Sequence, residues 1–170
     1  NATARCQLQD GDFLLSTFVG NPDDRSYFLP QNLFAEIDCS YRKNFVKADV
    51  LLKQSDDIVL EGVAEYNMDS EAYVANVKTD HLRLTDFVPS TGIEGLTTHV
   101  QATGRHFDFP GRHTSTDLNL QLNTLYYNNG KGERDSLYDV SLKAKLEKGR
   151  YFAQISSGHP YLMVDTQLEG

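Results

Sequence analysis

Alternation of apolar and polar residues recurs along most of this chain, and it is the feature that most constrains the fold. One run carries Val46, Ala48 and Val50 at alternate positions, and the charged residues Lys47 and Asp49 stand between them. Because successive side chains of a β-strand point to opposite faces, a period of two indicates a strand with one apolar and one polar side. No stretch of comparable length has the 3.6-residue period of an amphipathic helix. The sequence therefore predicts an all-β protein.

Short polar segments separate the alternating runs and predict the turns between strands. They lie at residues 54–57, 67–70, 128–132 and 148–149. Asn and Gly in such segments accommodate the positive φ of tight hairpin turns, so neighbouring strands should pair antiparallel, as a meander. Two longer joins contain Pro, at residues 21–24 and 109–112. They should lie at corners or edges of the sheet, because Pro cannot donate a ladder hydrogen bond.

Two parts of the chain depart from this pattern. Residues 1–31 lack clean alternation. Residues 82–94 contain the least regular apolar run, and we expect a helical turn within it.

A nine-residue pattern occurs twice, as YVANVKTDH at residues 73–81 and as YFAQISSGH at residues 151–159. In both copies an aromatic residue is followed at alternate positions by Ala and by a β-branched aliphatic residue, and His ends the segment. The pattern predicts one face of a strand followed by a turn. The copies represent either a true structural repeat or the similarity of hairpins built from the same residue types.

Length and charge exclude several classes of protein. The 170 residues, 39% of them hydrophobic, suffice for one soluble domain. A formal net charge of −8 argues against a nucleic-acid partner, because Lys and Arg are not in excess to replace phosphate counterions. No apolar run of about 18 residues predicts a membrane-spanning helix. We expect residues 1–170 to be a single all-β domain within a longer repeat protein, with residues 1–2 left by a cleaved tag.

No motif in the chain predicts catalysis or a cofactor. Phosphate-binding loops, nucleophile elbows and zinc-protease motifs are absent from the sequence. His99, His106 and His113 are spaced by seven residues, which places side chains on one face of a helix but not of strands and turns, so we expect no metal site. The two cysteines, Cys6 and Cys39, are compatible with one disulfide or with two free thiols. We expect a protein that is not an enzyme.

The alternating runs together predict one large apolar face. If two sheets close over it, the face is the core of a β-sandwich; if one sheet folds partway, the face lines an open groove for an apolar ligand such as lipid. The residues with the corresponding parity, and hence the predicted lining of a lipid groove, are Ala35, Ile37, Val46, Ala48, Val50, Leu52, Ile58, Leu60, Leu118, Leu120, Leu122, Val140, Leu142, Ala144, Leu146, Leu162 and Val164.

Two segments resemble a known family. NFVKADVLLKQSDDIVLEGVAEYN and SLYDVSLKAKLEKGRYFAQISSGHPYLMVDTQLEG are similar to the β-repeat portion of TamB-like and AsmA-like bacterial envelope proteins, a resemblance that covers roughly residues 32–170. It implies a U-shaped, taco-like sheet with an apolar concave face. It also implies a bridge through the periplasm of a Gram-negative cell, anchored in the inner membrane, that carries phospholipid toward the outer membrane. A role in assembling outer-membrane β-barrel proteins, which would then be partners, is also ascribed to the family.

Two other functions fit the same residues. A secreted adhesin- or pilus-like β-sandwich would bind through loops such as residues 21–24 and 110–113. A lipocalin-like carrier would enclose its lipid within one chain. Both alternatives are noncatalytic, and neither requires a cofactor or a metal.

Overall fold

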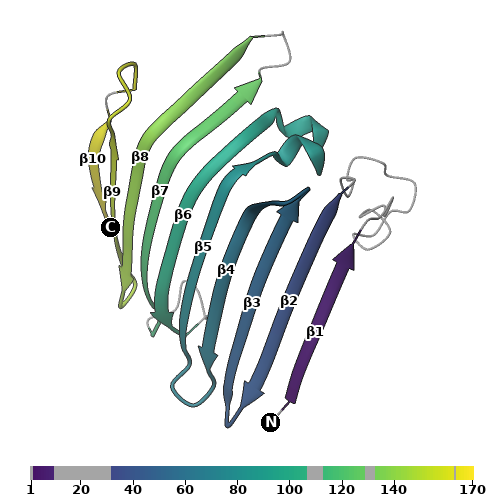
Figure 1. Ribbon diagram of the computed structural model, residues 1–170. Coiled ribbons are helices and arrows are strands. Elements are labelled where there is room, and N and C mark those ends of the chain that lie inside the picture. Colours follow the sequence, from purple (N-terminus) through teal and green to yellow (C-terminus); the bar gives the residue numbers. More distant parts are fainter. Residues whose placement is uncertain (1, 10–31, 107–112, 129–132, 163) are drawn as a thin grey trace.

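The computed structural model describes residues 2–9, 32–106, 113–128, 133–162 and 164–170. In this part of the chain, ten strands form one open sheet (Figure 1). The strands are β1 (Ala2–Gln9), β2 (Leu33–Arg42), β3 (Phe45–Gln54), β4 (Asp57–Asn67), β5 (Ala72–Leu82), β6 (Ile93–Arg105), β7 (Ser115–Asn128), β8 (Arg134–Glu147), β9 (Arg150–Ser157) and β10 (Asp165–Glu169). The prediction of an all-β protein is confirmed.

Each strand pairs antiparallel with its neighbours in sequence, so the predicted meander is confirmed. β1 and β10 lie at the two edges of the sheet. The described strands belong to this one sheet, and they therefore do not form the closed sandwich. Within the described ranges, no helix is long and apolar enough to cross a membrane.

The connections alternate between the two ends of the sheet (Figure 1). As drawn, β2, β4, β6 and β8 end at the lower end of the sheet, and β1, β3, β5, β7 and β9 end at the upper end. The predicted turns at 54–57, 67–70 and 148–149 are confirmed. Lys148 and Gly149 have φ of 53° and 76°, the pair of positive values typical of a type I′ hairpin. Residues 129–132 and the Pro-containing joins at 21–24 and 109–112 lie outside the described residues.

The β5–β6 connection contains the helical turn expected within residues 82–94. It forms two short 3-10 helices, η1 (Leu84–Asp86) and η2 (Pro89–Thr91). Gln54, at the end of β3, donates a hydrogen bond from Nε2 to Asp86 Oδ2 at 2.7 Å and so ties η1 to the sheet. Leu33, Val59 and Leu82 are the buried hydrophobic residues of the described chain, and all three lie near this upper end. The packed core is therefore small and local.

A register shift overturns the predicted position of Ile58. The β3–β4 pairing shifts between Leu52 and Lys53, so Ile58 lies opposite Lys53 and Val59 is the extra residue. Ile58 is 47% exposed, whereas Val59 is 6% exposed. The prediction that Ile58 shares a face with Leu60 is wrong, because a β-bulge inserts one residue and reverses the parity beyond it.

Leu162 and Val164 also depart from the predicted strand pattern. They lie in the β9–β10 connection, outside the strands, and Leu162 is 38% exposed. The backbone N–H of Ser157 donates to the carbonyl of Val164, so this segment turns back toward β9. In contrast, residues 2–9 form an edge strand that the irregularity of residues 1–31 concealed.

The two copies of the nine-residue pattern occupy equivalent positions, in β5 and β9. Tyr73 and Tyr151 begin the two segments near the lower end, and each segment leads to a His just beyond or at the end of its strand. The two histidines differ in environment. His159 is 9% exposed, whereas the side chain of His81 is 72% exposed beside Asp80.

His159 should stabilise the β9–β10 connection. Its Nε2 donates to the Ser136 carbonyl at 3.1 Å, its Nδ1 accepts from the Tyr161 N–H at 3.2 Å, and its ring centroid lies 4.4 Å from that of Tyr138. We expect His159→Ala to lower the free energy of unfolding by about 1–3 kcal/mol, because two hydrogen bonds and the packing of a buried ring against Tyr138 are lost. His81→Ala is the matched control and should change it by less than about 0.5 kcal/mol. Denaturant unfolding measures both; equal losses would contradict this role.

Candidate functional site

Cross-strand pairing aligns alternate residues of β2 to β9 in four rows, which together we call the four-row face. The first row, nearest the upper end, is Ala35, Leu52, Leu60, Thr79, Thr98, Leu122, Val140 and Ser157. The second row is Ile37, Val50, Gly62, Val77, Val100, Leu120, Leu142 and Ile155. The third row is Cys39, Ala48, Ala64, Ala75, Ala102, Leu118, Ala144 and Ala153. The fourth row is Tyr41, Val46, Tyr66, Tyr73, Gly104, Thr116, Leu146 and Tyr151.

The four rows contain no charged side chain. All of the predicted lining residues lie in them except Ile58, Leu162 and Val164. The rows also contain residues that were not predicted, chiefly from β5, β6 and β9. In β5 and β9, the repeated nine-residue pattern indicates which residues share this face. Counting alternate residues from Tyr73 and from Tyr151, the side chains lie in the fourth, third, second and first rows in turn.

The hydrophobic side chains of the four-row face are incompletely covered. None of them is among the buried hydrophobic residues, and Ile37, Tyr41 and Tyr151 are 42%, 39% and 53% exposed. The total accessible surface is 11611 Å² for a chain of 19.1 kDa. A globular protein of that mass exposes about 8400 Å².

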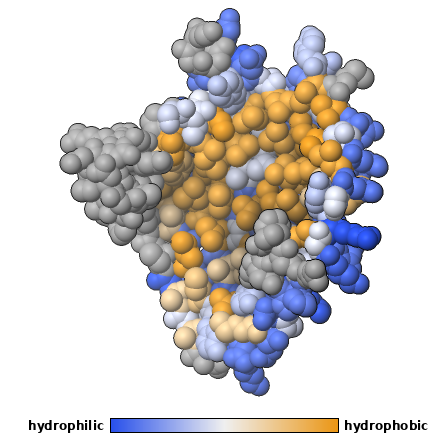
Figure 2. Space-filling model, turned by 180° about the vertical axis from the view of Figure 1, so that it is seen from behind, coloured by the Kyte–Doolittle hydropathy of each residue, from blue (hydrophilic) through white to orange (hydrophobic). Residues whose placement is uncertain are grey.

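The four-row face extends over most of the sheet, although Thr79, Thr98, Thr116 and Ser157 interrupt its apolar side chains. Eight strands about 4.8 Å apart and four rows about 6.8 Å apart span roughly 34 by 20 Å, or roughly 700 Å². The largest apolar patch on a typical soluble monomer covers about 300–600 Å² and is often functional. Figure 2 shows the hydrophobic side chains gathered across the centre of this side of the molecule. A hollow of about 460 Å³ lies at its lower end, lined in part by Leu118, Ala144, Leu146 and Tyr151.

Comparisons with models of known protein families, with curated proteins and with solved structures found no match. The geometry of the four-row face is therefore the basis for assigning a function.

The opposite face of the sheet carries the charges. Lys47 pairs with Asp49 at 2.9 Å and Lys78 with Glu61 at 3.6 Å. At the β1 edge, Arg5 donates two hydrogen bonds to Asp38, at 2.6 and 2.7 Å. These hydrogen bonds are the main cause of a pKa of Asp38 below its ordinary value of 3.8. The charged face resembles the solvated side of a one-sided sheet.

The Arg5–Asp38 pair should make the attachment of β1 dependent on pH. Because the folded-state pKa of Asp38 is lowered, its contribution to stability is present above the ordinary value of 3.8 and is lost as the pH falls through the lower folded-state value. We expect hydrogen-exchange protection of the β1 amides, relative to those of β3, to fall in that acid range. In Asp38→Asn, β1 should be less protected already at neutral pH and should lack this transition. If the Asp38→Asn variant kept the same acid transition, other carboxyl groups would be its cause.

The polar residues considered for metal and disulfide chemistry are dispersed. His99 Nε2 lies 2.8 Å from Asn76 Oδ1, on the charged face. At the lower end, His106 Nδ1 lies 2.7 Å from Glu71 Oε2, and the His106 and His113 ring centroids are 6.3 Å apart. The described residues contain no group of three or more potential metal ligands. Cys39 is a free thiol in the third row.

Proposed function

We propose that this chain is a noncatalytic, lipid-carrying segment of a bacterial envelope protein, and that the four-row face holds the acyl chains. The observation that carries the proposal is a continuous uncharged face across eight strands without a covering layer of described residues. Apolar side chains exposed over such an area favour an apolar ligand. The charged side chains of the opposite face make the same sheet soluble in water.

Acyl chains match this face in energy and in length. Burying a methylene group contributes about 0.8 kcal/mol, so a sixteen-carbon chain needs a long continuous apolar surface to offset roughly 12 kcal/mol of exposure to water. A face roughly 34 by 20 Å, with strand and row spacings as above, is large enough to cover such a chain.

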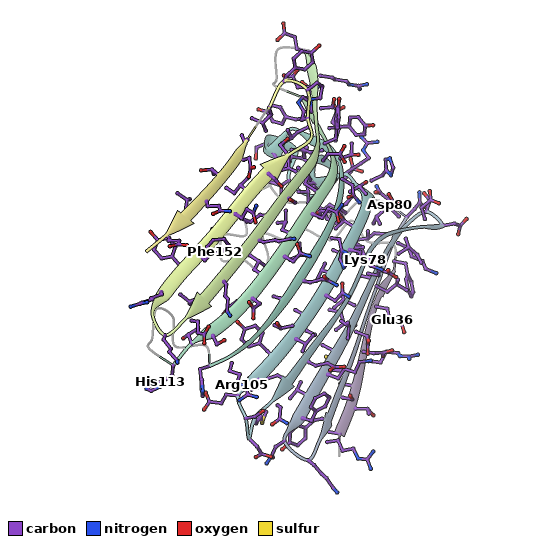
Figure 3. All side chains as sticks on the ribbon, turned by 90° about the vertical axis from the view of Figure 1, so that its left-hand side faces the viewer. Glu36, Lys78, Asp80, Arg105, His113 and Phe152 are labelled. Carbon is purple, nitrogen blue, oxygen red and sulfur yellow. The ribbon has the colours of Figure 1, made fainter. Side chains whose placement is uncertain are left out.

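The proposed site is the floor of a trough, with the four-row face on its concave side. In Figure 3, β8 to β10 are seen face-on, whereas β1 to β4 are seen nearly edge-on, so the direction of the sheet surface changes from one edge to the other, as a trough requires. Register shifts in the β3–β4, β5–β6 and β6–β7 pairings also support bending, since β-bulges bend strands and increase their twist. A U-shaped, taco-like sheet would shelter acyl chains and leave polar headgroups at its mouth.

The resemblance to TamB-like and AsmA-like proteins supports a place in the periplasm. There the segment would extend an apolar path along which phospholipid moves toward the outer membrane, within a protein anchored in the inner membrane. Assistance to the assembly of outer-membrane β-barrel proteins is the other role that this resemblance supports.

The test places a photo-crosslinking amino acid at Leu120 and, as the matched control, at the adjacent Gln121, whose side chain faces the opposite side of β7. The chain is expressed in a Gram-negative cell, irradiated and analysed by mass spectrometry. We expect phospholipid adducts at position 120 and roughly background labelling at position 121. Equal labelling at both positions, or none at position 120, would contradict the proposal.

A further inference from the structure

The face opposite the four-row face changes in character across the sheet. One row of paired residues crosses it from β1 to β10, and over β1 to β3 this row is charged, with Arg5, Asp38 and Asp49. Over β5 to β10 the same row carries five side-chain amides and one lysine. These six residues, which we call the amide row, are Asn76, Gln101, Asn119, Lys143, Gln154 and Gln167. Charged side chains keep the first part of the face in water, so solubility does not require amides over the rest.

The amides of this row are available to a ligand. Within the described ranges, the side chains of Gln101, Asn119 and Gln154 form no hydrogen bond with another residue. Asn76 Oδ1 lies 2.8 Å from His99 Nε2, which holds the β5 end of the row in place. Each side-chain amide has two N–H donors and one carbonyl acceptor. The row therefore presents donors and acceptors side by side.

A hollow of about 600 Å³ lies beside the amide row. Its lining includes the members of that row from β5 to β8 and the whole of the next row toward the lower end, which is Val74, Thr103, Asp117, Lys145 and Phe152. Val74 is 44% exposed and Phe152 is half-buried, so an apolar side chain borders the hollow on β5 and another on β9. In Figure 3, Phe152 lies on the strands seen face-on, away from Glu36 and Lys78.

Sugars match this combination of groups. A sugar hydroxyl both donates and accepts hydrogen bonds, as a side-chain amide does, and the acetamido group of an N-acetylated sugar is itself an amide. The C–H faces of a sugar ring can pack on an aromatic side chain, and binding sites combine such apolar contacts with a few placed polar groups. An acyl chain would instead leave the amides without partners, at a cost in free energy. Six strands about 4.8 Å apart give the amide row a length of roughly 24 Å, which suits a chain of several units.

We infer that the amide row and its hollow bind a glycan chain of N-acetylated sugars, which lies across the strands from β5 to β9. The hydroxyl and acetamido groups pair with the amides of the row, and one sugar ring packs on Phe152. This site lies on the face opposite the proposed acyl-chain site, so the two ligands do not compete. The inference goes beyond the proposed function and does not require it.

The test titrates the purified chain with chitin oligosaccharides of two and six N-acetylglucosamine units and measures the heat of binding. We expect the longer one to bind at least roughly tenfold more tightly, since it reaches more of the row. Asn119→Ala should weaken its binding by roughly fivefold, the effect of losing one hydrogen bond. Phe152→Leu, which keeps an apolar side chain but removes the flat ring, should weaken it to a similar extent. Asp49→Ala is the matched control, because Asp49 is an exposed member of the same row on β3, outside the hollow.

The outcomes bear on the glycan site alone. Failure of the unmodified chain to bind the six-unit oligosaccharide would overturn the inference, as would equal effects of Asn119→Ala and Asp49→Ala on the affinity. Equal affinities for the two lengths would overturn the path across the strands, because the ligand would then occupy one position only. Lipid carriage is tested separately, by the crosslinking at Leu120, and either result can be obtained without the other.

Discussion

Replacing Leu120 or Leu142 with Arg is expected to leave the sheet folded and to abolish lipid binding. The two residues face each other in the second row, at the centre of the four-row face, and neither is buried. On an open face, the long aliphatic stem of Arg can lie along neighbouring apolar side chains while its guanidinium reaches water. In a closed core the same charge would be buried without a partner, at a cost of several kcal/mol against a total stability of about 5–15 kcal/mol.

Thermal melting and lipid analysis of the same preparations measure the two effects. The melting temperature should fall by only a few degrees, whereas phospholipid that copurifies with the unmodified chain should be lost, because acyl chains cannot cover a charged group at low cost. Gln121→Arg, on the charged face of the same strand, should change neither quantity. Unfolding of Leu120→Arg together with normal folding of Gln121→Arg would show that the four-row face is a covered core.

Gly104→Ala is expected to be among the most destabilising small substitutions in the sheet. Gly104 lies in the fourth row between Tyr73 and Thr116. A Cβ atom at this position would lie 2.5 Å from the Tyr73 Oη and would collide with the Ser115 carbonyl oxygen. The Tyr73 ring lies over the glycine, and its hydroxyl is hydrogen-bonded to Thr116 Oγ1 at 2.6 Å, so the ring cannot move without loss of that bond. We expect a loss of about 2–3 kcal/mol, at the upper part of the range for overpacking.

Gly62→Ala is the matched control, since Gly62 occupies the second row of the same sheet. A Cβ atom there would lie 3.3 Å from Val77 Cγ2, a contact that a small side-chain shift relieves. Its effect on the free energy of unfolding should stay below about 1 kcal/mol. Urea unfolding ranks the two variants. Similar losses of stability in both variants would mean that the Tyr73–Gly104 contact does not make Gly104 harder to replace than Gly62.

Local sequence determined most of the strands and their facing. The alternation of Val46, Ala48 and Val50 with Lys47 and Asp49 suffices to predict a strand and to say which side chains share a side, because side-chain direction in a strand depends on parity alone. Short polar turns between such runs predict antiparallel neighbours, because a two-residue hairpin can join only antiparallel strands.

Only the tertiary structure shows where the alternation of apolar and polar residues stops predicting side-chain direction, and how the strands combine into one sheet. Ile58 leaves the four-row face because a bulge against Lys53 shifts the register, and a bulge depends on the partner strand as well as on the local sequence. Leu162 and Val164 leave it because the chain turns around the buried His159 before β10 begins. The alignment of alternate residues from eight strands into uncharged rows depends on seven separate registers. These are relations between residues distant in sequence, and the pairing of the whole sheet fixes them, because each strand's neighbours set which of its residues lie side by side.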